Sequence, residues 1–420
     1  STAEAIDVTG ASGNGTTTIT LNPSSDLDGA TEYYIEIDAS AFDDLSGNSF
    51  AGITDNGTWS FTTASTVNDL VNGWSAFHKI TILASKINGD LANFPVYVNL
   101  RYLPSTFFST VDTNGADIRM TNNGQVQELP FELVEIDTAN GTGELWFKAD
   151  YISSSTDTDF YLWYGNGSVS AYAETDTYGA QNVWTQGYVA VYHMNEDPSG
   201  GAGAIKDSTS YNNDATSTGS MTTGDLVTGE LGKAIDFDGS DDYLTTDNGT
   251  EFEFGTGDFT LTATISPDDV DNGPSDQFTI ISKASNGYES FVSQDNCDSY
   301  AGGTSNSLRN TLPLSTAATY FTSTVRESGT LYGYINGVLD TTQANSANVS
   351  NSGQLVLIGN SPSASYHFDG ALDEVRISNE ARSVDWISTE YSNQRYTRNF
   401  YLIDDTPLNR SSLIFFWTIP

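Results

Sequence analysis

The chain has 420 residues, and its 55 acidic against 15 basic residues give it a formal net charge of −40. Proteins bind phosphate backbones and anionic membrane surfaces with Lys and Arg, so this composition argues strongly against nucleic acid and charged membranes as partners. Acidic disordered chains are poor in aromatic residues, whereas this chain holds 22 Tyr, 21 Phe and 7 Trp, which predicts folded domains.

Short runs of β-branched and aromatic residues alternate with polar ones along most of the chain, and Gly, Ser, Thr, Asn and Asp fill the turns between them. Long segments with helical periodicity are nearly absent, so we expect an all-β protein of roughly two to four domains. The single cysteine, Cys297, excludes an intrachain disulfide and does not decide the compartment.

The first residues, Ser1 to Glu4, lack the charged and apolar stretches of a signal peptide. No apolar run approaches the ~20 residues that span a bilayer. We therefore expect a mature or excised segment that does not insert into a membrane.

Residues 1–65 contain three alternating segments, at 16–21, 32–38 and 57–63, separated by Asp-, Gly- and Asn-rich turns. The closing run from Trp59 to Thr63 (Trp-Ser-Phe-Thr-Thr) resembles that of bacterial Ig-like domains found in surface and adhesin arrays. Such sandwiches have about seven strands, so the resemblance implies a partial domain that acts as a spacer.

Residues 66–178 begin with a short polar linker and continue as a second series of strands. The series closes with Asp159 to Asn166, which contains the run Tyr-Leu-Trp-Tyr-Gly-Asn. This pattern resembles a bacterial β-sandwich domain of unknown function that commonly precedes laminin-G-like modules. The resemblance implies an architecture and no activity.

Residues 179–399 carry two alternating segments, at 234–244 and 370–378, with carboxylates at outward positions. They resemble the opening and closing strands of the laminin-G-like, concanavalin-type jelly roll, a fold that usually binds glycans or proteins. The usual Trp-His before the central strand is replaced by residues 319–325. Residues 381–387 resemble the short helix that ends such domains.

Helices are commonly capped by Ser or Asn, so Asn379 or Ser378 is the expected cap of that helix. Residues 400–420 form a tail or the start of a following domain, and the apolar stretch from Leu413 to Pro420 would be adhesive unless it is covered. The predicted fold class is therefore all-β, with tandem β-sandwiches that end in a laminin-G-like jelly roll.

Calcium is the expected metal, because it prefers six to eight oxygen ligands and acidic loops supply them. In laminin-G-like jelly rolls a loop of the form Asp-x-Ser-x-x-Asn often lies near the aspartate of the closing strand. By that resemblance Asp207, Asn212 and Asp373 are the ligand candidates, with Asp238 and Asp241 in reserve. The alternative is that all five are solvated turn residues.

Catalysis is not expected within these residues. Glycosidases need two carboxylates about 5–10 Å apart, and the segment from Glu135 to Asp137 lacks the further Glu of glucanase motifs. The histidines, His78, His193 and His367, lie in separate segments without zinc-type spacing. Cys297 is followed directly by an acid, which disfavours a reactive thiolate.

Sugar binding would use exposed aromatic rings flanked by polar groups. The candidates are Tyr211, Tyr288, Tyr300 and Tyr366, and the alternative for each is that it caps the edge of the sandwich. The low content of Lys and Arg argues against sulfated or uronic acid ligands unless calcium bridges them.

These observations predict an extracellular, adhesin-type bacterial surface protein that recognises glycans or surface ligands through its jelly roll, without catalysis. One alternative is the accessory, carbohydrate-binding region of a secreted polysaccharide-degrading enzyme. Another is a structural stalk, in which the partial domain and the apolar tail assemble by strand addition. The ligand, the role of the second unit and the oligomeric state are left open by the sequence.

Overall fold

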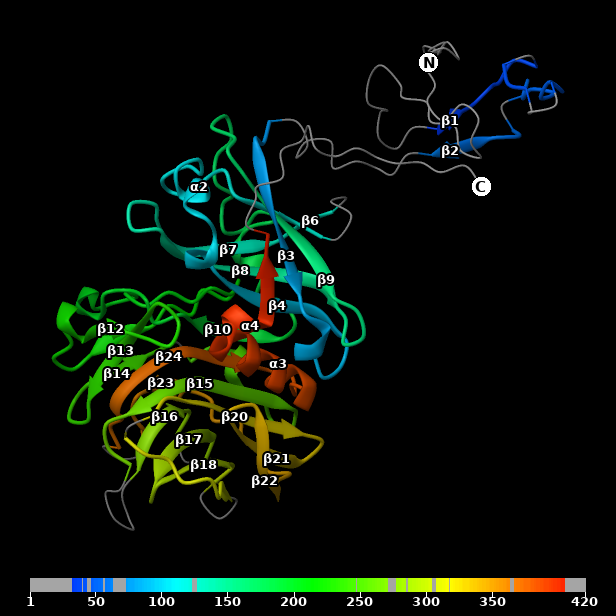
Figure 1. The fold of residues 1–420 in the computed structure, drawn as a ribbon. Helices are drawn as coiled ribbons and strands as arrows, with labels where there is room; N and C mark the ends of the chain where they lie inside the picture. The colour runs from blue at the N-terminus through cyan, green and yellow to red at the C-terminus, as the bar shows by residue number, and fades with distance from the viewer. Residues whose placement is uncertain are drawn as a thin grey trace.

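Most of the regular elements in the computed structural model are β-strands, as the sequence predicts (Figure 1). The structure describes residues 32–39, 41–43, 47–55, 57–62, 73–122, 127–246, 248–270, 277–284, 286–303, 307–316, 318–362 and 366–404. Among these residues, no helix is both long enough and apolar enough to cross a membrane.

The Ig-like region contributes one described pair of strands. Strand β1 (Glu32–Tyr34) runs antiparallel to β2 (Ser60–Thr62). Both lie within the segments predicted to be strands. The third predicted strand, residues 16–21, lies outside the described residues.

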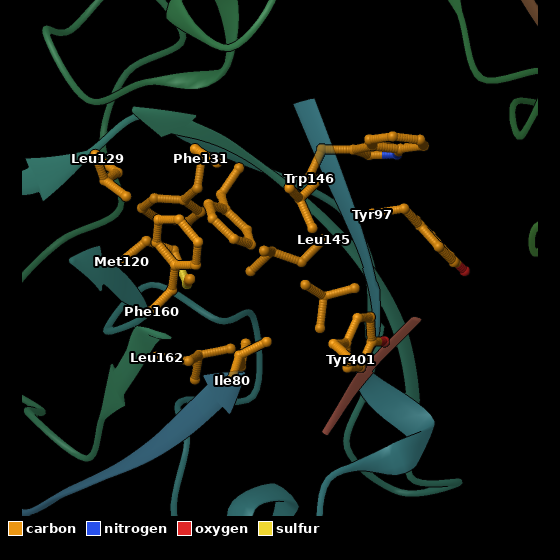
Figure 2. Packing of buried hydrophobic residues seen from close by; sticks show 14 of the residues in the cluster. Ile80, Tyr97, Met120, Leu129, Phe131, Leu145, Trp146, Phe160, Leu162 and Tyr401 are labelled. Carbon is orange, nitrogen blue, oxygen red and sulfur yellow. The ribbon is translucent and has the colours of Figure 1, made fainter. Parts of the chain in front are cut away.

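The second unit is a sandwich of two antiparallel sheets, one with strand order β25-β3-β9-β5-β6 and the other with order β4-β8-β7. Their bounds are β3 (Ala76–Ile82), β4 (Leu91–Asn99), β5 (Arg119–Thr121), β6 (Glu128–Leu129), β7 (Phe131–Asp137), β8 (Thr142–Ile152), β9 (Thr158–Tyr164) and β25 (Tyr401–Ile403). Between the sheets Ile80, Phe160 and Leu162 pack with Phe131 and Leu145 (Figure 2).

The third unit is a larger sandwich with the jelly-roll architecture that the sequence predicts. One sheet has the order β12-β13-β24-β15-β20-β21-β22, with β10 also paired to β24, and the other has the order β11-β14-β23-β16-β17-β18-β19. Their bounds are β10 (Tyr188–Tyr192), β11 (Thr216–Thr218), β12 (Leu226–Thr228), β13 (Lys233–Asp238), β14 (Tyr243–Thr245), β15 (Phe259–Pro267), β16 (Phe278–Ser282), β17 (Tyr288–Ser293), β18 (Asn296–Ala301), β19 (Ser307–Arg309), β20 (Tyr320–Glu327), β21 (Thr330–Ile335), β22 (Val338–Ala344), β23 (Leu357–Ile358) and β24 (Asp369–Ser378). Ile265, Val292 and Leu372 lie in the core between the sheets.

The helices are short and lie at connections between the strands. The α-helices are α2 (Ser105–Phe108), α3 (Val384–Arg395) and α4 (Thr397–Phe400). The 3-10 helices are η2 (Ala84–Lys86), η3 (Leu100–Tyr102), η4 (Ala180–Asn182), η5 (Pro198–Gly200), η6 (Thr223–Asp225) and η7 (Thr250–Phe252).

The predicted C-terminal helix exists, but the cap prediction is wrong. Helix α3 begins at Val384, and the side chain of Ser383 accepts a hydrogen bond from the backbone N–H of Trp386. Ser378 is still part of strand β24, so neither it nor Asn379 is in a position to cap the helix.

The second unit and the jelly roll share one apolar cluster. Both faces of the β4-β8-β7 sheet are covered, because Leu145 points into the unit's own core while Tyr97 and Trp146 point away from it (Figure 2). Around these two rings the cluster continues into residues that follow the second unit: Trp184, Tyr188, Val191, Leu231 and Trp386. The two sandwiches are therefore packed as one body.

After the jelly roll the chain returns to the second unit. The side-chain oxygen of Asn393 in α3 accepts from the backbone N–H of Tyr97 at 2.7 Å, and its amide donates to the Tyr97 carbonyl at 3.0 Å. Strand β25 then pairs with β3, with Tyr401 opposite Ile82. The first residues of the predicted tail thus belong to the second unit's sheet.

Replacing Asn393 tests how strongly this return holds the two units together. Asn393→Ala leaves both peptide groups of Tyr97 buried without these partners, so we expect the free energy of unfolding to fall by about 2–4 kcal/mol. Urea denaturation of the whole chain, followed by tryptophan fluorescence, measures the change. Ser392→Ala on the same helix is the control and should change the stability by less than about 0.5 kcal/mol; equal effects of the two variants would contradict the prediction.

Candidate functional site

The carboxylate of Asp207 is buried, and both of its oxygens accept hydrogen bonds from nearby residues. One oxygen accepts from the backbone N–H groups of Val191 and Thr209, both at 3.0 Å. The other accepts from the Thr209 hydroxyl at 2.8 Å and the Asn213 N–H at 2.9 Å. Four donors occupy the lone pairs that a metal would need, so Asp207 fixes the conformation of the loop.

The other two first-choice ligands do not join Asp207. The side-chain oxygen of Asn212 accepts from Gln181 at 2.9 Å, and its amide donates to the carbonyl of Ser210. Asp373 lies on β24 and accepts from the N–H of Leu231 at 2.9 Å. The structure thus gives each residue a separate partner.

The two reserve residues, in contrast, lie together. Asp238, Asp241 and Asp242, which we call the rim triad, each offer a carboxylate oxygen within 4.8 Å of the others. Asp238 ends β13, and Asp241 and Asp242 lie on the turn between β13 and β14. Asp238 and Asp241 are the predicted reserve ligands, whereas Asp242 was not predicted although the run Asp-Gly-Ser-Asp-Asp was visible in the sequence.

Local hydrogen bonds shape this turn. The Asp238 carboxylate accepts from the N–H groups of Ser240 at 2.8 Å and Asp241 at 3.1 Å, which folds the chain back on itself. Ser220 donates its hydroxyl to Asp241 at 3.0 Å and its N–H to Asp242 at 3.2 Å. The carboxylates therefore converge because the backbone places them.

Further acids surround the rim triad and repel it. Burial, followed by the charge of Asp238, raises the pKa of Asp242. Burial, followed by the charges of Asp268 and other acids, also raises the pKa of Asp236 on β13 and of Asp369 at the start of β24. This repulsion favours a divalent cation at the triad, because the cation would offset several negative charges at once.

Ring-bearing side chains lie next to the rim triad. His367 lies with Nδ1 3.4 Å from the carbonyl of Asp242, and its ring centroid is 5.9 Å from that of Tyr243. Both side chains are partly exposed, as is the neighbouring Tyr366. Tyr366 is one of the predicted sugar-binding residues, whereas the sequence pattern did not point to His367 or Tyr243.

Two of the four predicted sugar-binding tyrosines are buried, which corrects that prediction. The ring of Tyr288 packs in the core 5.0 Å from Phe254. Tyr300 is buried on β18 and donates its hydroxyl to Glu289 at 2.6 Å. Neither ring can present a flat face to a sugar. Tyr211 is 48% exposed in the loop that Asp207 braces.

The Glu289 carboxylate on β17 is completely buried. It accepts hydrogen bonds from four hydroxyl groups, those of Thr279, Ser282, Tyr300 and Ser361. Burial raises its pKa. A carboxylate held in this way braces three strands and the loop around Ser361, and it does not face solvent.

His193 belongs to a buried network between the two units. Its Nδ1 lies 2.7 Å from Glu374 on β24, and its Nε2 lies 3.2 Å from Glu132 on β7 of the second unit. Burial opposes protonation, but these two carboxylates raise the pKa of His193 well above its usual range, so the ring is charged at neutral pH. The imidazole of His193 therefore has a structural role between the two units.

Arg376 completes the network. Its guanidinium pairs with Glu374 and, at 2.5 Å, with Glu390 of α3. The same group lies 4.4 Å from the ring centroid of Trp146 and 4.8 Å from that of Trp184. A charge from the jelly roll is thereby enclosed by aromatic rings of the second unit and its connection.

A second pair of buried acids faces the 229–232 loop of the jelly roll. Asp373 accepts from Leu231 on this loop, and its other oxygen has no hydrogen-bond partner in the structure. Glu144 of β8 lies so close to Gly232 that a Cβ there would be 1.3 Å from the carboxylate. Burial, followed by the charge of Glu374, raises the pKa of Glu144 to about 7.

The raised pKa of Glu144 predicts that the protein loses stability as the pH rises. The folded state favours the protonated acid, so this contribution is complete below the usual pKa of 4.5 and is lost as the pH passes about 7. The loss is at most about 3 kcal/mol between those two values.

Glu144→Gln should remove this part of the pH dependence. Chemical denaturation of the whole chain between pH 4.5 and 8 measures it, and Glu327→Gln at the exposed end of β20 is the matched control. A wild-type protein and a Glu144→Gln variant with parallel stability profiles would contradict the assignment.

Three family models match successive parts of the chain. Residues 1–63 match the bacterial Ig-like domain, residues 114–182 match a domain of unknown function (DUF2341), and residues 238–388 match the concanavalin A-like lectin/glucanases superfamily. These matches confirm the predicted order of an Ig-like unit, a sandwich of unknown function and a laminin-G-like jelly roll. The exact boundaries of the units remain predictions.

Several solved structures resemble about half of the chain. They include the binding domain of Paraclostridial Mosquitocidal Protein 1 (13% identity, 49% of this chain and 52% of that chain, TM-score 0.42) and the receptor binding domain of botulinum neurotoxin C/D mosaic serotype (14%, 50% and 51%, TM-score 0.39). Domain 4 of AbnA, a GH43 extracellular arabinanase from Geobacillus stearothermophilus, has 16% sequence identity to this chain. That alignment covers 49% of this chain and 98% of that chain, with a TM-score of 0.38. The alignments span about half of the two toxin chains. No curated protein matches the chain.

Proposed function

We propose that the jelly roll is a glycan-recognition module whose rim triad binds calcium, in a protein that acts outside the cell. The observation that carries this proposal is the group of three converging carboxylates beside the partly exposed rings of Tyr243 and His367. Ring faces bind the apolar side of sugars, and polar groups beside them bind the hydroxyls. The match to a lectin/glucanase model supports the same class of ligand.

The donor set of the rim triad fits calcium. Its ligands are carboxylate oxygens, which hard cations prefer, and the hydroxyl of Ser220 lies beside them. Water or ligand hydroxyls would complete the six to eight positions that calcium takes. A bound ion would hold the β13–β14 turn and supply a positive charge toward which sugar hydroxyls orient.

Recognition without catalysis is the function that the buried acids support. Glu289 is enclosed by hydroxyl groups, and Glu374 is paired with Arg376 and His193, so neither carboxylate is placed to receive a substrate. Burial, followed by the charge of Asp298, raises the pKa of Cys297 to about 12, which disfavours a nucleophilic thiolate. The accessory region of a polysaccharide-degrading enzyme is compatible with the same site and remains the second candidate.

Calcium should stabilise the folded protein through the rim triad. An ion that binds only the native state at about 100 times its Kd adds about 2.7 kcal/mol, which raises the Tm of the whole chain by a few degrees. Asp241→Asn with Asp242→Asn should abolish this rise, whereas Asp38→Asn in the Ig-like unit should not. Calorimetry with calcium and then with chelator measures the effect, and identical melts for the wild-type protein under both conditions would refute the calcium site.

Glycan binding should depend on the same residues. On an array of neutral polysaccharides, the whole chain should bind one polymer class with calcium, and the signal should fall at least tenfold with chelator or in the Asp241→Asn, Asp242→Asn variant. The Asp38→Asn variant should bind as the wild type does. Release of reducing ends from the bound polymer would contradict the non-catalytic function, and a chelator-resistant signal would place the ligand away from the rim triad.

A further inference from the structure

Two arginines that lie far apart in the sequence meet in one open cavity. The cavity has a volume of about 620 Å³ and is lined by Arg101 and Tyr102 of η3, Arg398 of α4, and Tyr401, Leu402 and Ile403 of β25. We call it the arginine cavity. Cavities of about 300–1,000 Å³ are the usual size for small-ligand sites.

Both arginines that line the arginine cavity are exposed, so their guanidinium groups are accessible to a ligand. Within the part of the chain that the structure describes, neither Arg101 nor Arg398 forms an ion pair. Two unpaired positive charges on one wall attract an anion, and a guanidinium binds a carboxylate through two parallel hydrogen bonds.

An apolar surface accompanies the charges. The ring of Tyr102 is 37% exposed, and the guanidinium of Arg398 lies 5.9 Å from its centroid. Leu402 is 56% exposed on the adjoining strand. An anion with an attached ring or carbon skeleton would fill both parts of the cavity, whereas a bare inorganic anion would leave the apolar part uncovered.

The cavity walls are held in place. The hydroxyl of Tyr401 accepts from the backbone N–H of Asn99 at 2.9 Å, and the Asn99 side chain accepts from the N–H of Arg101 at 3.1 Å. These two bonds link β25 to η3. The site therefore exists because the chain returns to the second unit after the jelly roll.

The outer edge of β25 adds polar groups to the cavity. The N–H of Asp404 donates to the carbonyl of Lys79, so in an antiparallel ladder the peptide groups of Tyr401 and Ile403 point away from β3. Three residues of edge are too few for strand addition to provide most of the affinity. A small ligand is favoured over an extended peptide.

We infer that the arginine cavity binds a saccharide through a single carboxylate, as in a uronic acid, with the sugar ring against Tyr102 and Leu402. The net charge of −40 repels long polyanions, so a ligand with one acidic group is favoured over a polyanionic chain. The scarcity of basic residues argues against uronic acid ligands unless calcium bridges them, but the fold brings two arginines together in this cavity. The site does not use the rim triad.

A comparison of two probes tests the charge requirement. Methyl galacturonide should bind saturably to the whole chain in ligand-observed NMR, and its methyl ester, which keeps the ring and removes the charge, should bind at least tenfold more weakly. Arg101→Gln and Arg398→Gln should each weaken binding, and the double variant should lose at least tenfold. Lys86→Gln, which removes another basic residue that forms no ion pair with the acids the structure describes, should have no effect.

Further arms of the experiment identify the ligand class. Tyr102→Ala should weaken binding and Tyr102→Phe should keep it, because the ring supplies the apolar face. Galactose 6-sulfate or an acetylated aspartyl peptide that bound as well as the uronide would overturn the assignment to a carboxylate-bearing sugar, as would equal binding of acid and ester. Binding should persist with chelator and in the Asp241→Asn, Asp242→Asn double variant. The experiments therefore distinguish a wrong assignment at the rim triad from a wrong assignment at the arginine cavity.

Discussion

The packing of the second unit on the jelly roll depends on the buried guanidinium of Arg376. Removing a charge from water costs several kcal/mol, and Glu374 and Glu390, which belong to the jelly roll, offset part of that cost by pairing with the guanidinium. The rings of Trp146 and Trp184 cover the same group. The jelly roll thus carries a face that is completed by the preceding sandwich, and the two are better regarded as one structural module.

The ion pairs inside the fold also explain where charged groups without an oppositely charged partner are found. The buried bases are used inside the fold: Lys283 pairs with Glu253, and Arg119 pairs with Glu128. Acids outnumber bases by 40, so the excess carboxylates must lie where water or a cation solvates them. The rim triad is one such place. The arginine cavity is the opposite case, because no described acid forms an ion pair with either of its two guanidinium groups.

The sequence is informative where the two faces of a strand carry different kinds of residue. The alternation in β13 and β24 identified both strands, because apolar residues face the core on one side and polar residues occupy the other. The expectation that the carboxylates point outward is wrong for β24, where Asp373 and Glu374 are buried against the second unit. Along β8, Glu144 to Phe147 are all buried, so the pattern did not show that one face belongs to a neighbouring domain. Contacts between segments such as His193 and Glu132 depend on the docking of two sheets, which local patterns do not encode.

The candidate metal ligands show a second limit to what can be predicted from the sequence. Acidic loops reveal oxygen atoms, but not whether their lone pairs are free. In Asp207 the backbone N–H groups of its own loop occupy them, and in Asp238 and its neighbours the turn brings several carboxylates together instead. The tyrosines failed for a simpler reason, since Tyr288 and Tyr300 lie on strands β17 and β18 rather than in loops.

The pairing of β25 with β3 has a mechanical consequence. The two strands are antiparallel and lie side by side, with Ile403 at the end of β25 opposite Ile80 of β3 (Figure 1). A pulling force applied at Ala76 and Ile403 would run across this one strand pair and separate its hydrogen bonds one after another, beginning at Ile403. The rest of the jelly roll lies outside that line of tension and would keep its shape while the strand pair bears the load.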